Sequence, residues 1–174
     1  MNDPVSNTTE FIGMMTETRS DEHWLLLGGH AAVSEDQLWT AWLGLASRYQ
    51  NDSMRANSID VEFIRLIAGT HQIRVAFERA GITVGDEMAW LIHLPNFSSD
   101  SIHEMSWPTL DRHALDHEAL RLMTILGASL LPHLPMPHAK TVERLELEIE
   151  PELMADYGAI ERSALAHIAL ADYS

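Results

Sequence analysis

The segment from Asn57 to Leu94 constrains the fold most, because it marks the ends of two helices and a strand within a short distance. Between Ile59 and Ile67 the apolar residues recur about every 3.6 positions, which is typical of an amphipathic helix. Ser58 is suited to cap the start of this helix, and Gly69 can end it in the left-handed conformation. The first helix of the segment is therefore predicted to stop at Gly69.

A second helix and a strand are predicted directly after this glycine. Thr70 can cap the helix and Gly81 can end it, while small and apolar residues repeat with helical spacing between them. Beyond a short turn, the apolar run Met88–Leu94 is ended by Pro95. This run is too short for a helix by preference and is apolar enough for a buried strand.

The rest of the chain predicts an α+β fold in one domain, with a small, mostly antiparallel or mixed sheet packed against several helices in a two-layer arrangement. Residues 144–150 alternate between apolar and acidic, which favours a half-buried strand. The other predicted strands are 9–16 and 24–28. The other predicted helices are 35–49, one from about Asp116, a short one from Pro151 ended by Gly158, and a final one over about 159–171. Irregular connections are expected at about 96–111 and 131–139.

Length and composition limit the class of protein. A chain of 174 residues is long enough for one hydrophobic core and short for two, so we expect one domain spanning 1–174. The absence of cysteine removes disulfides, thiolate metal sites and cysteine nucleophiles. No apolar run reaches the length of a membrane-spanning helix, and the first residues lack the pattern of a signal peptide. We therefore expect a cytoplasmic protein that does not engage a membrane.

The charge is strongly acidic but unevenly distributed. The chain has 26 Asp and Glu against 11 Lys and Arg, which argues against general adhesion to nucleic acid. The stretch from Arg48 to Arg79 is the exception, because it holds five arginines and only four acidic residues. These arginines either solvate the outer faces of two helices or form an anion-binding surface, and the sequence leaves both readings open.

Catalytic motifs are scarce. His113 and His117 stand four residues apart on a predicted helix, a spacing that suits metal ligands, but the glutamate of the H-E-x-x-H motif is missing. The sequence holds no phosphate-binding P-loop, no G-x-G-x-x-G motif and no G-x-S-x-G elbow. We therefore expect no enzyme activity and no cofactor. A metal-dependent enzyme that uses the two histidines remains the alternative.

The predicted final helix is apolar or small on nearly all sides. Helices of this kind are usually covered on more than one side. The domain therefore either buries the helix completely, or a partner protein covers its outer face.

Two sequence blocks carry a family resemblance. The first comprises the N-S start, the A-G-x-x-Q-I hinge and the later alanine and glycine, and the second is the closing I-E-R-x-A-L-x-x-I-A-L run over 160–170. In this order they resemble the small noncatalytic subunit of the KEOPS complex, of the archaeal type, a family that includes the human PRPK-binding protein. Matching positions in the first block are Asn57, Ser58, Ala68, Gly69, Gln72, Ile73, Ala76 and Gly81.

The resemblance implies a role in an assembly that installs threonylcarbamoyl on the adenosine beside the anticodon of tRNA. A subunit of this family binds the kinase-like ATPase of the complex and recruits tRNA through its 3′ CCA end. By this resemblance and the local arginines, the expected RNA-binding residues are Arg65, Gly69, Thr70, His71, Gln72 and Arg74. The expected partner-binding residues are Leu165, Ile168 and Ala169. His71 stands where the family often has arginine, and an adaptor role in another complex is a further alternative.

Overall fold

A two-stranded antiparallel sheet lies at the centre of the molecule. In the computed structural model, which describes residues 4–96 and 110–173, the strands pair so that Leu26 lies opposite Leu91. Seven α-helices accompany the sheet in this described part, so the fold is a single, mostly helical α+β domain. The strands are β1 (Trp24–Gly28) and β2 (Ala89–His93), and the helices are α1 (Thr8–Thr18), α2 (Glu35–Gln50), α3 (Ile59–Ile67), α4 (Ile73–Ala80), α6 (Arg112–Ile125), α7 (Ala139–Leu145) and α8 (Tyr157–Leu170).

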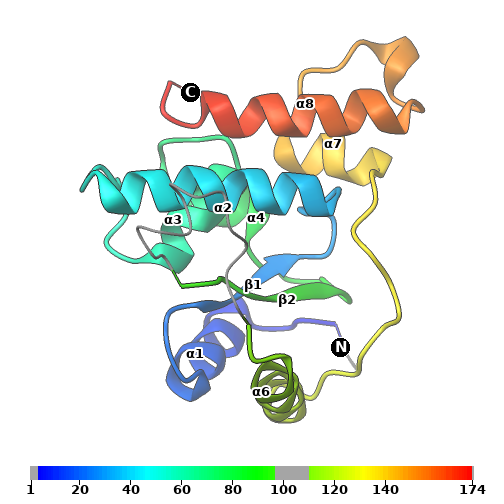
Figure 1. Ribbon diagram of the computed structural model, residues 1–174. Coiled ribbons are helices and arrows are strands. Elements are labelled where there is room, and N and C mark those ends of the chain that lie inside the picture. The colour runs from blue at the N-terminus through cyan, green and yellow to red at the C-terminus, as the bar shows by residue number, and fades with distance from the viewer. Residues whose placement is uncertain (1–3, 97–109, 174) are drawn as a thin grey trace.

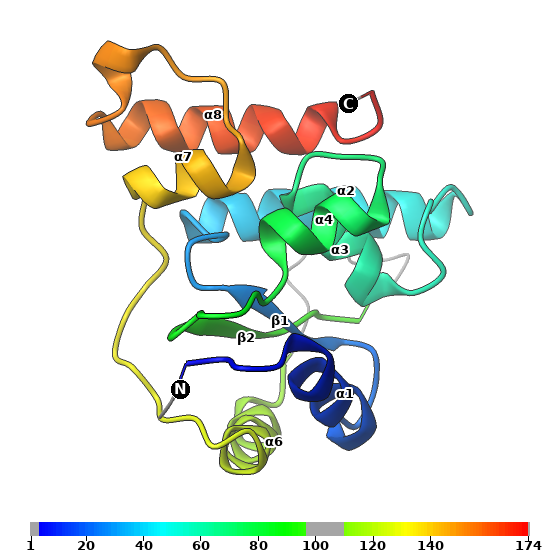
Figure 2. The same ribbon diagram turned by 180° about the vertical axis from the view of Figure 1, so that it is seen from behind.

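Helices cover both sides of this sheet (Figures 1 and 2). Helices α2, α3 and α4 lie on one side and α1 and α6 on the other, while α7 and α8 lie beyond α2 and α3. The main core fills the space between β1, α2, α3 and α8. A smaller core joins α1, β1 and α6 through Met15, Trp24, Leu122 and Leu126. The final helix is thus packed against the central helices and is far from α6.

The central segment forms the predicted order of helix, helix and strand. Helix α3 ends before Gly69, which has a φ of 60°, as a left-handed stop requires. Helix α4 begins at Ile73, later than expected, because Thr70 belongs to the turn between the helices, where its Oγ1 accepts a hydrogen bond from the Gln72 N–H at 3.2 Å. Strand β2 occupies the apolar run before Pro95.

The strand predicted at residues 9–16 is wrong, because this stretch lies in helix α1. Asn7 caps the helix by accepting a hydrogen bond from the Glu10 N–H at 3.3 Å. One side of α1 packs into the smaller core, where Met15 is buried beside α6. A short apolar stretch does not distinguish a strand from a helix, and here contact with a distant helix favours the helix.

The strand predicted at 144–150 is also wrong. Helix α7 continues to Leu145 and ends where Glu146 adopts the left-handed conformation, with a φ of 53°. The alternation of the sequence nevertheless matches the burial, because Leu145 and Leu147 are buried while Glu146 and Glu148 are exposed. The apolar residues reach the core without a neighbouring strand, so no sheet forms here.

Three further boundaries differ from expectation. Helix α8 already begins at Tyr157, because Asp156 caps it through the N–H groups of Gly158 and Ala159. Helix α6 begins at Arg112, and the turn at Pro151–Leu153 is a 3₁₀ helix. The expected loop at 96–111 falls almost wholly outside the described residues. Within the described residues, no helix is both long and apolar enough to cross a membrane.

Candidate functional site

The turn between α3 and α4 is packed directly against α8. His167 of α8 donates a hydrogen bond from Nε2 to the main-chain oxygen of Ala68 at 2.8 Å, and burial lowers the pKa of this imidazole. The ring also covers Gly69, where a Cβ atom would lie 2.0 Å from the His167 Cδ2. Glycine is therefore required at this hinge for its backbone conformation and for the space that His167 occupies.

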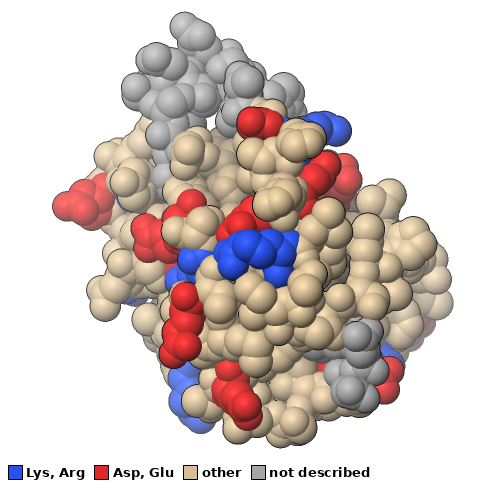
Figure 3. Space-filling view, turned by 90° about the horizontal axis from the view of Figure 1, so that it is seen from below, with Lys and Arg blue, Asp and Glu red and all other residues tan. Residues whose placement is uncertain are grey.

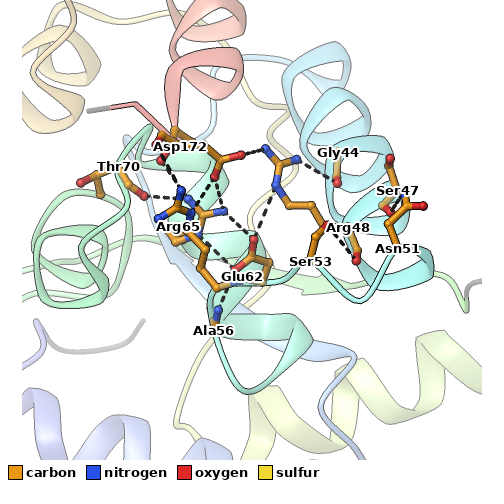
Figure 4. A network of polar contacts seen from close by, with 12 residues as sticks. Gly44, Ser47, Arg48, Asn51, Ser53, Ala56, Glu62, Arg65, Thr70 and Asp172 are labelled. Atoms are coloured by element: carbon orange, nitrogen blue, oxygen red, sulfur yellow. Dashed lines mark hydrogen bonds and ion pairs between the residues drawn. The ribbon is translucent and has the colours of Figure 1, made fainter.

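Arg65 lies on the inner face of α3 in a network of charged groups (Figure 4). Its side chain is completely buried, and so is that of Glu62 one turn earlier. The Arg65 Nη2 lies 2.5 Å from the Glu62 Oε1, and Nε donates to Oε2 at 3.1 Å. Glu62 also accepts hydrogen bonds from the main-chain N–H groups of Arg55 and Ala56. The buried charges are thus paired and hydrogen-bonded, as burial in a core requires.

The same guanidinium joins the hinge to the end of α8. Its Nη1 donates to the main-chain oxygens of Thr70 at 3.1 Å and Ala171 at 2.9 Å, and Nη2 lies 3.0 Å from the Asp172 carboxylate. With these partners Arg65 holds three parts of the core together and offers no surface to a ligand. The expectation that Arg65 contacts RNA is therefore corrected.

Asp172 is held at the end of α8 by three arginines. Arg48 of α2 contacts its Oδ2 at 2.7 Å, while Arg55 and Arg65 contact its Oδ1 at 3.3 and 3.0 Å. Burial alone would raise the pKa of Asp172, but the hydrogen bond from Arg48 and the neighbouring positive charges hold this pKa below its usual value. We call this group, Arg48, Arg55, Arg65 and Asp172, the arginine clamp.

The remaining expected RNA-binding residues divide between the interior and the surface. Gly69 and Thr70 are buried in the turn, whereas His71, Gln72 and Arg74 are exposed at the start of α4. The Arg74 side chain is 83% exposed and forms a surface ion pair with Glu78 at 3.0 Å. The exposed residues that lead into α4 and form its start are called the hinge corner: His71, Gln72, Ile73 and Arg74.

Helix α8 presents different residues to the core and to the solvent. The inner side packs on α2 and α3 through Ile160, Ala164, Ile168 and Ala171, all buried. The expectation that Ile168 binds a partner is therefore corrected, since its side chain is part of the core. Leu165 is half-buried and Ala169 is exposed. Exposed residues recur with helical spacing along α8 and just beyond its end, and form what we call the outer stripe: Arg162, Ala166, Ala169, Leu170 and Tyr173.

The sequence predicted a partner surface on the final helix and named Ala169, but not the other residues of the outer stripe, and it did not predict the arginine clamp. The stripe contains no carboxylate in a chain with 26 acidic residues, and its one charged residue, Arg162, lies 3.9 Å from Asp156. Helical spacing counted from Arg162 could have identified the outer stripe once the buried side of α8 was known. The clamp had no local signal, because Arg48 and Asp172 are far apart in the sequence.

The two histidines of the alternative metal site are exposed on α6. Among residues 4–96 and 110–173, no three side chains of His, Asp or Glu are grouped closely enough to hold a metal ion. His103, which stands near this pair in the sequence, lies outside the described residues.

Comparison of the sequence with protein-family models and with curated proteins finds no significant match.

Proposed function

We propose that this protein is a noncatalytic subunit of the KEOPS complex, which installs threonylcarbamoyl on the adenosine beside the anticodon of tRNA. In this role the outer stripe of α8 binds the kinase-like ATPase subunit, and the hinge corner helps to recruit tRNA through its 3′ CCA end. The resemblance of the central segment and of the closing helix to this family supports the proposal.

The observation that carries the proposal is the composition of the outer stripe. Ala166 and Ala169 are small, Leu170 and Tyr173 are apolar or aromatic and are 54% and 86% exposed. Small side chains allow a partner to approach the helix closely, and exposed apolar side chains gain free energy when a partner covers them. An acidic protein that leaves one helix face without carboxylates has a surface suited to protein contact.

The arginine clamp supports this role by fixing the helix. Asp172 and the main-chain oxygen of Ala171 are tied to α2 and α3 by Arg48 and Arg65. A helix that is already held in place loses little conformational entropy when a partner binds to it. Leu170 and Tyr173, which flank the clamp, are therefore presented in a fixed orientation.

Affinity for the kinase-like subunit tests the first part of the proposal. Leu170→Glu and Ala169→Glu should each weaken binding about tenfold or more in isothermal titration calorimetry, because a carboxylate would be buried at the contact. Both positions are exposed, so these variants should fold normally. Val84→Glu is the matched control, since Val84 is 68% exposed in the turn before β2. Unchanged affinity in both α8 variants would contradict the proposed docking surface.

The hinge corner is proposed to bind the single-stranded end of tRNA weakly. His71 and Arg74 can contact phosphates or stack on bases, and the first N–H groups of α4 point toward the same corner. Because the remaining surface is acidic, binding should weaken steeply as salt rises.

Fluorescence anisotropy with intact tRNA and with tRNA that lacks the CCA end tests this part. Intact tRNA should bind more tightly, and Arg74→Ala should remove most of the difference. Arg112→Ala, an exposed arginine of α6, should leave the difference unchanged. Equal affinity for the two RNAs would exclude recognition of the CCA end.

A further inference from the structure

The stretch between Arg121 and Lys140 contains no Asp, Glu, Lys or Arg, although the chain has a net charge of −15. It comprises the last part of α6 and the connection from α6 to α7. Figure 3 shows the molecule from the side of α1 and α6: charged side chains gather toward one part of this face, and a broad area beside them carries no charge. In Figure 1 the connection starts at α6, at the opposite end of the molecule from α8, and runs up to α7.

Four large apolar side chains project from the connection that follows α6. Leu130 is 75% exposed and Leu134 is 71% exposed, and Leu131 and Met136 are 52% and 45% exposed. We call these four residues the leucine patch. Single exposed apolar residues are common on protein surfaces, but several together usually mark a contact surface.

An open apolar pocket of about 220 Å³ lies directly beside the leucine patch. Leu130 and Leu131 form one wall of this pocket, and Phe11, Trp90 and Met123 contribute to the others. The Trp90 indole is fixed by the hydrogen bond that its Nε1–H donates to the main-chain oxygen of Gly29 at 2.9 Å. The leucine patch therefore adjoins an apolar pocket whose lining contains no charged residue.

We propose that this surface joins two copies of the chain in a twofold-symmetric dimer, in which Leu134 of each copy enters the pocket of the other. A twofold axis makes every contact twice, so a surface that carries both a projection and a hollow can bind itself. This inference does not depend on the proposed function, since α8 stays free in both copies.

The absence of charge on this stretch permits a second copy to approach it. Two chains of net charge −15 repel each other, and the repulsion is smallest where the facing surfaces carry no carboxylates. A standard interface covers about 800 Å² on each partner, around an apolar centre such as the leucine patch supplies. Three prolines, Pro132, Pro135 and Pro137, restrict the backbone of the connection, which lowers the entropy lost when it is ordered in a contact.

Sedimentation equilibrium of the full chain over a range of protein concentrations tests the dimer. The mass should rise from one to two chains with concentration, and the dissociation constant should fall as salt screens the repulsion. Leu134→Glu and Leu130→Glu should each weaken the dimer about tenfold or more, because each places two carboxylates in the symmetric contact. Leu43→Glu, at a position of α2 that is 55% exposed, should leave it unchanged.

Circular dichroism of the same variants checks that each is folded. A wild-type protein that remains one chain at every concentration and salt condition would overturn the proposal. A dimer that both patch variants leave intact would overturn it equally.

Discussion

The guanidinium of Arg65 donates a hydrogen bond to the main-chain oxygen of Ala171 across 2.9 Å. This bond joins the last turn of α3 to the residue that directly follows α8, two parts of the chain separated by more than half its length. A residue expected on the surface because of its charge is thus at the centre of the contact that holds the closing helix in position. The stability of α8, and hence the presentation of its outer stripe, depends on this buried arginine.

Removing the buried partner of Arg65 should destabilise the protein strongly. Glu62→Ala leaves the buried guanidinium without its closest carboxylate, and we expect a loss of about 3–5 kcal/mol in the free energy of unfolding. Urea denaturation measures this loss. Glu78→Ala breaks the exposed pair with Arg74 and should cost no more than about 0.5 kcal/mol, so similar losses in both variants would contradict the structural role of Glu62.

Gly69→Ala should be much more harmful than Gly127→Ala. Both glycines have a φ near 60°, so alanine is strained at either position. At Gly127 a Cβ atom would meet nothing within 4 Å, and we expect a cost of about 1 kcal/mol. At Gly69 it would collide with His167, which must move and lose its hydrogen bond to Ala68, for a total of about 3 kcal/mol.

Thermal unfolding of the two variants gives this comparison directly. A Gly69→Ala protein as stable as Gly127→Ala would mean that His167 does not occupy the space above the hinge.

Two residues of α8 that lie two positions apart, Ile168 and Leu170, should separate stability from partner binding. Ile168→Ala should lower the free energy of unfolding by about 2–4 kcal/mol, because the side chain is 4% exposed in the core. Leu170→Ala should change it by less than about 0.5 kcal/mol, because Leu170 is 54% exposed. Chemical denaturation of both variants checks this. A large loss for Leu170→Ala would place it in the core and remove it from the proposed docking surface.

The stability should decrease in mild acid through His167. Burial lowers the pKa of this imidazole below its usual 6.5. The folded protein therefore binds its proton less readily than the unfolded chain, so the stabilising contribution is full above pH 6.5 and is lost as the pH falls through the lower folded value. His30 and His93 have lowered pKa values for the same reason and contribute in the same direction.

Unfolding free energies between pH 8 and pH 5 for the wild type and for His167→Gln test this linkage, since glutamine keeps an N–H donor near the Nε2 position but does not titrate. We expect a smaller dependence on pH in the variant. Parallel curves for the two proteins would assign the dependence to other groups.

The sequence by itself determined the local features of the central segment: the left-handed stop at Gly69, the strand before Pro95 and the amphipathic helix between Ile59 and Ile67. These features follow from backbone freedom, proline geometry and helical periodicity, which act over a few neighbouring residues. Only the tertiary structure decided that residues 9–16 are helical, that Arg65 is buried and that Ile168 faces the core. Each of these depends on partners distant in the sequence: Leu122 of α6 for residues 9–16, Asp172 and Ala171 for Arg65, and the helices α2 and α3 for Ile168. Burial beside such partners decides what a residue can contact.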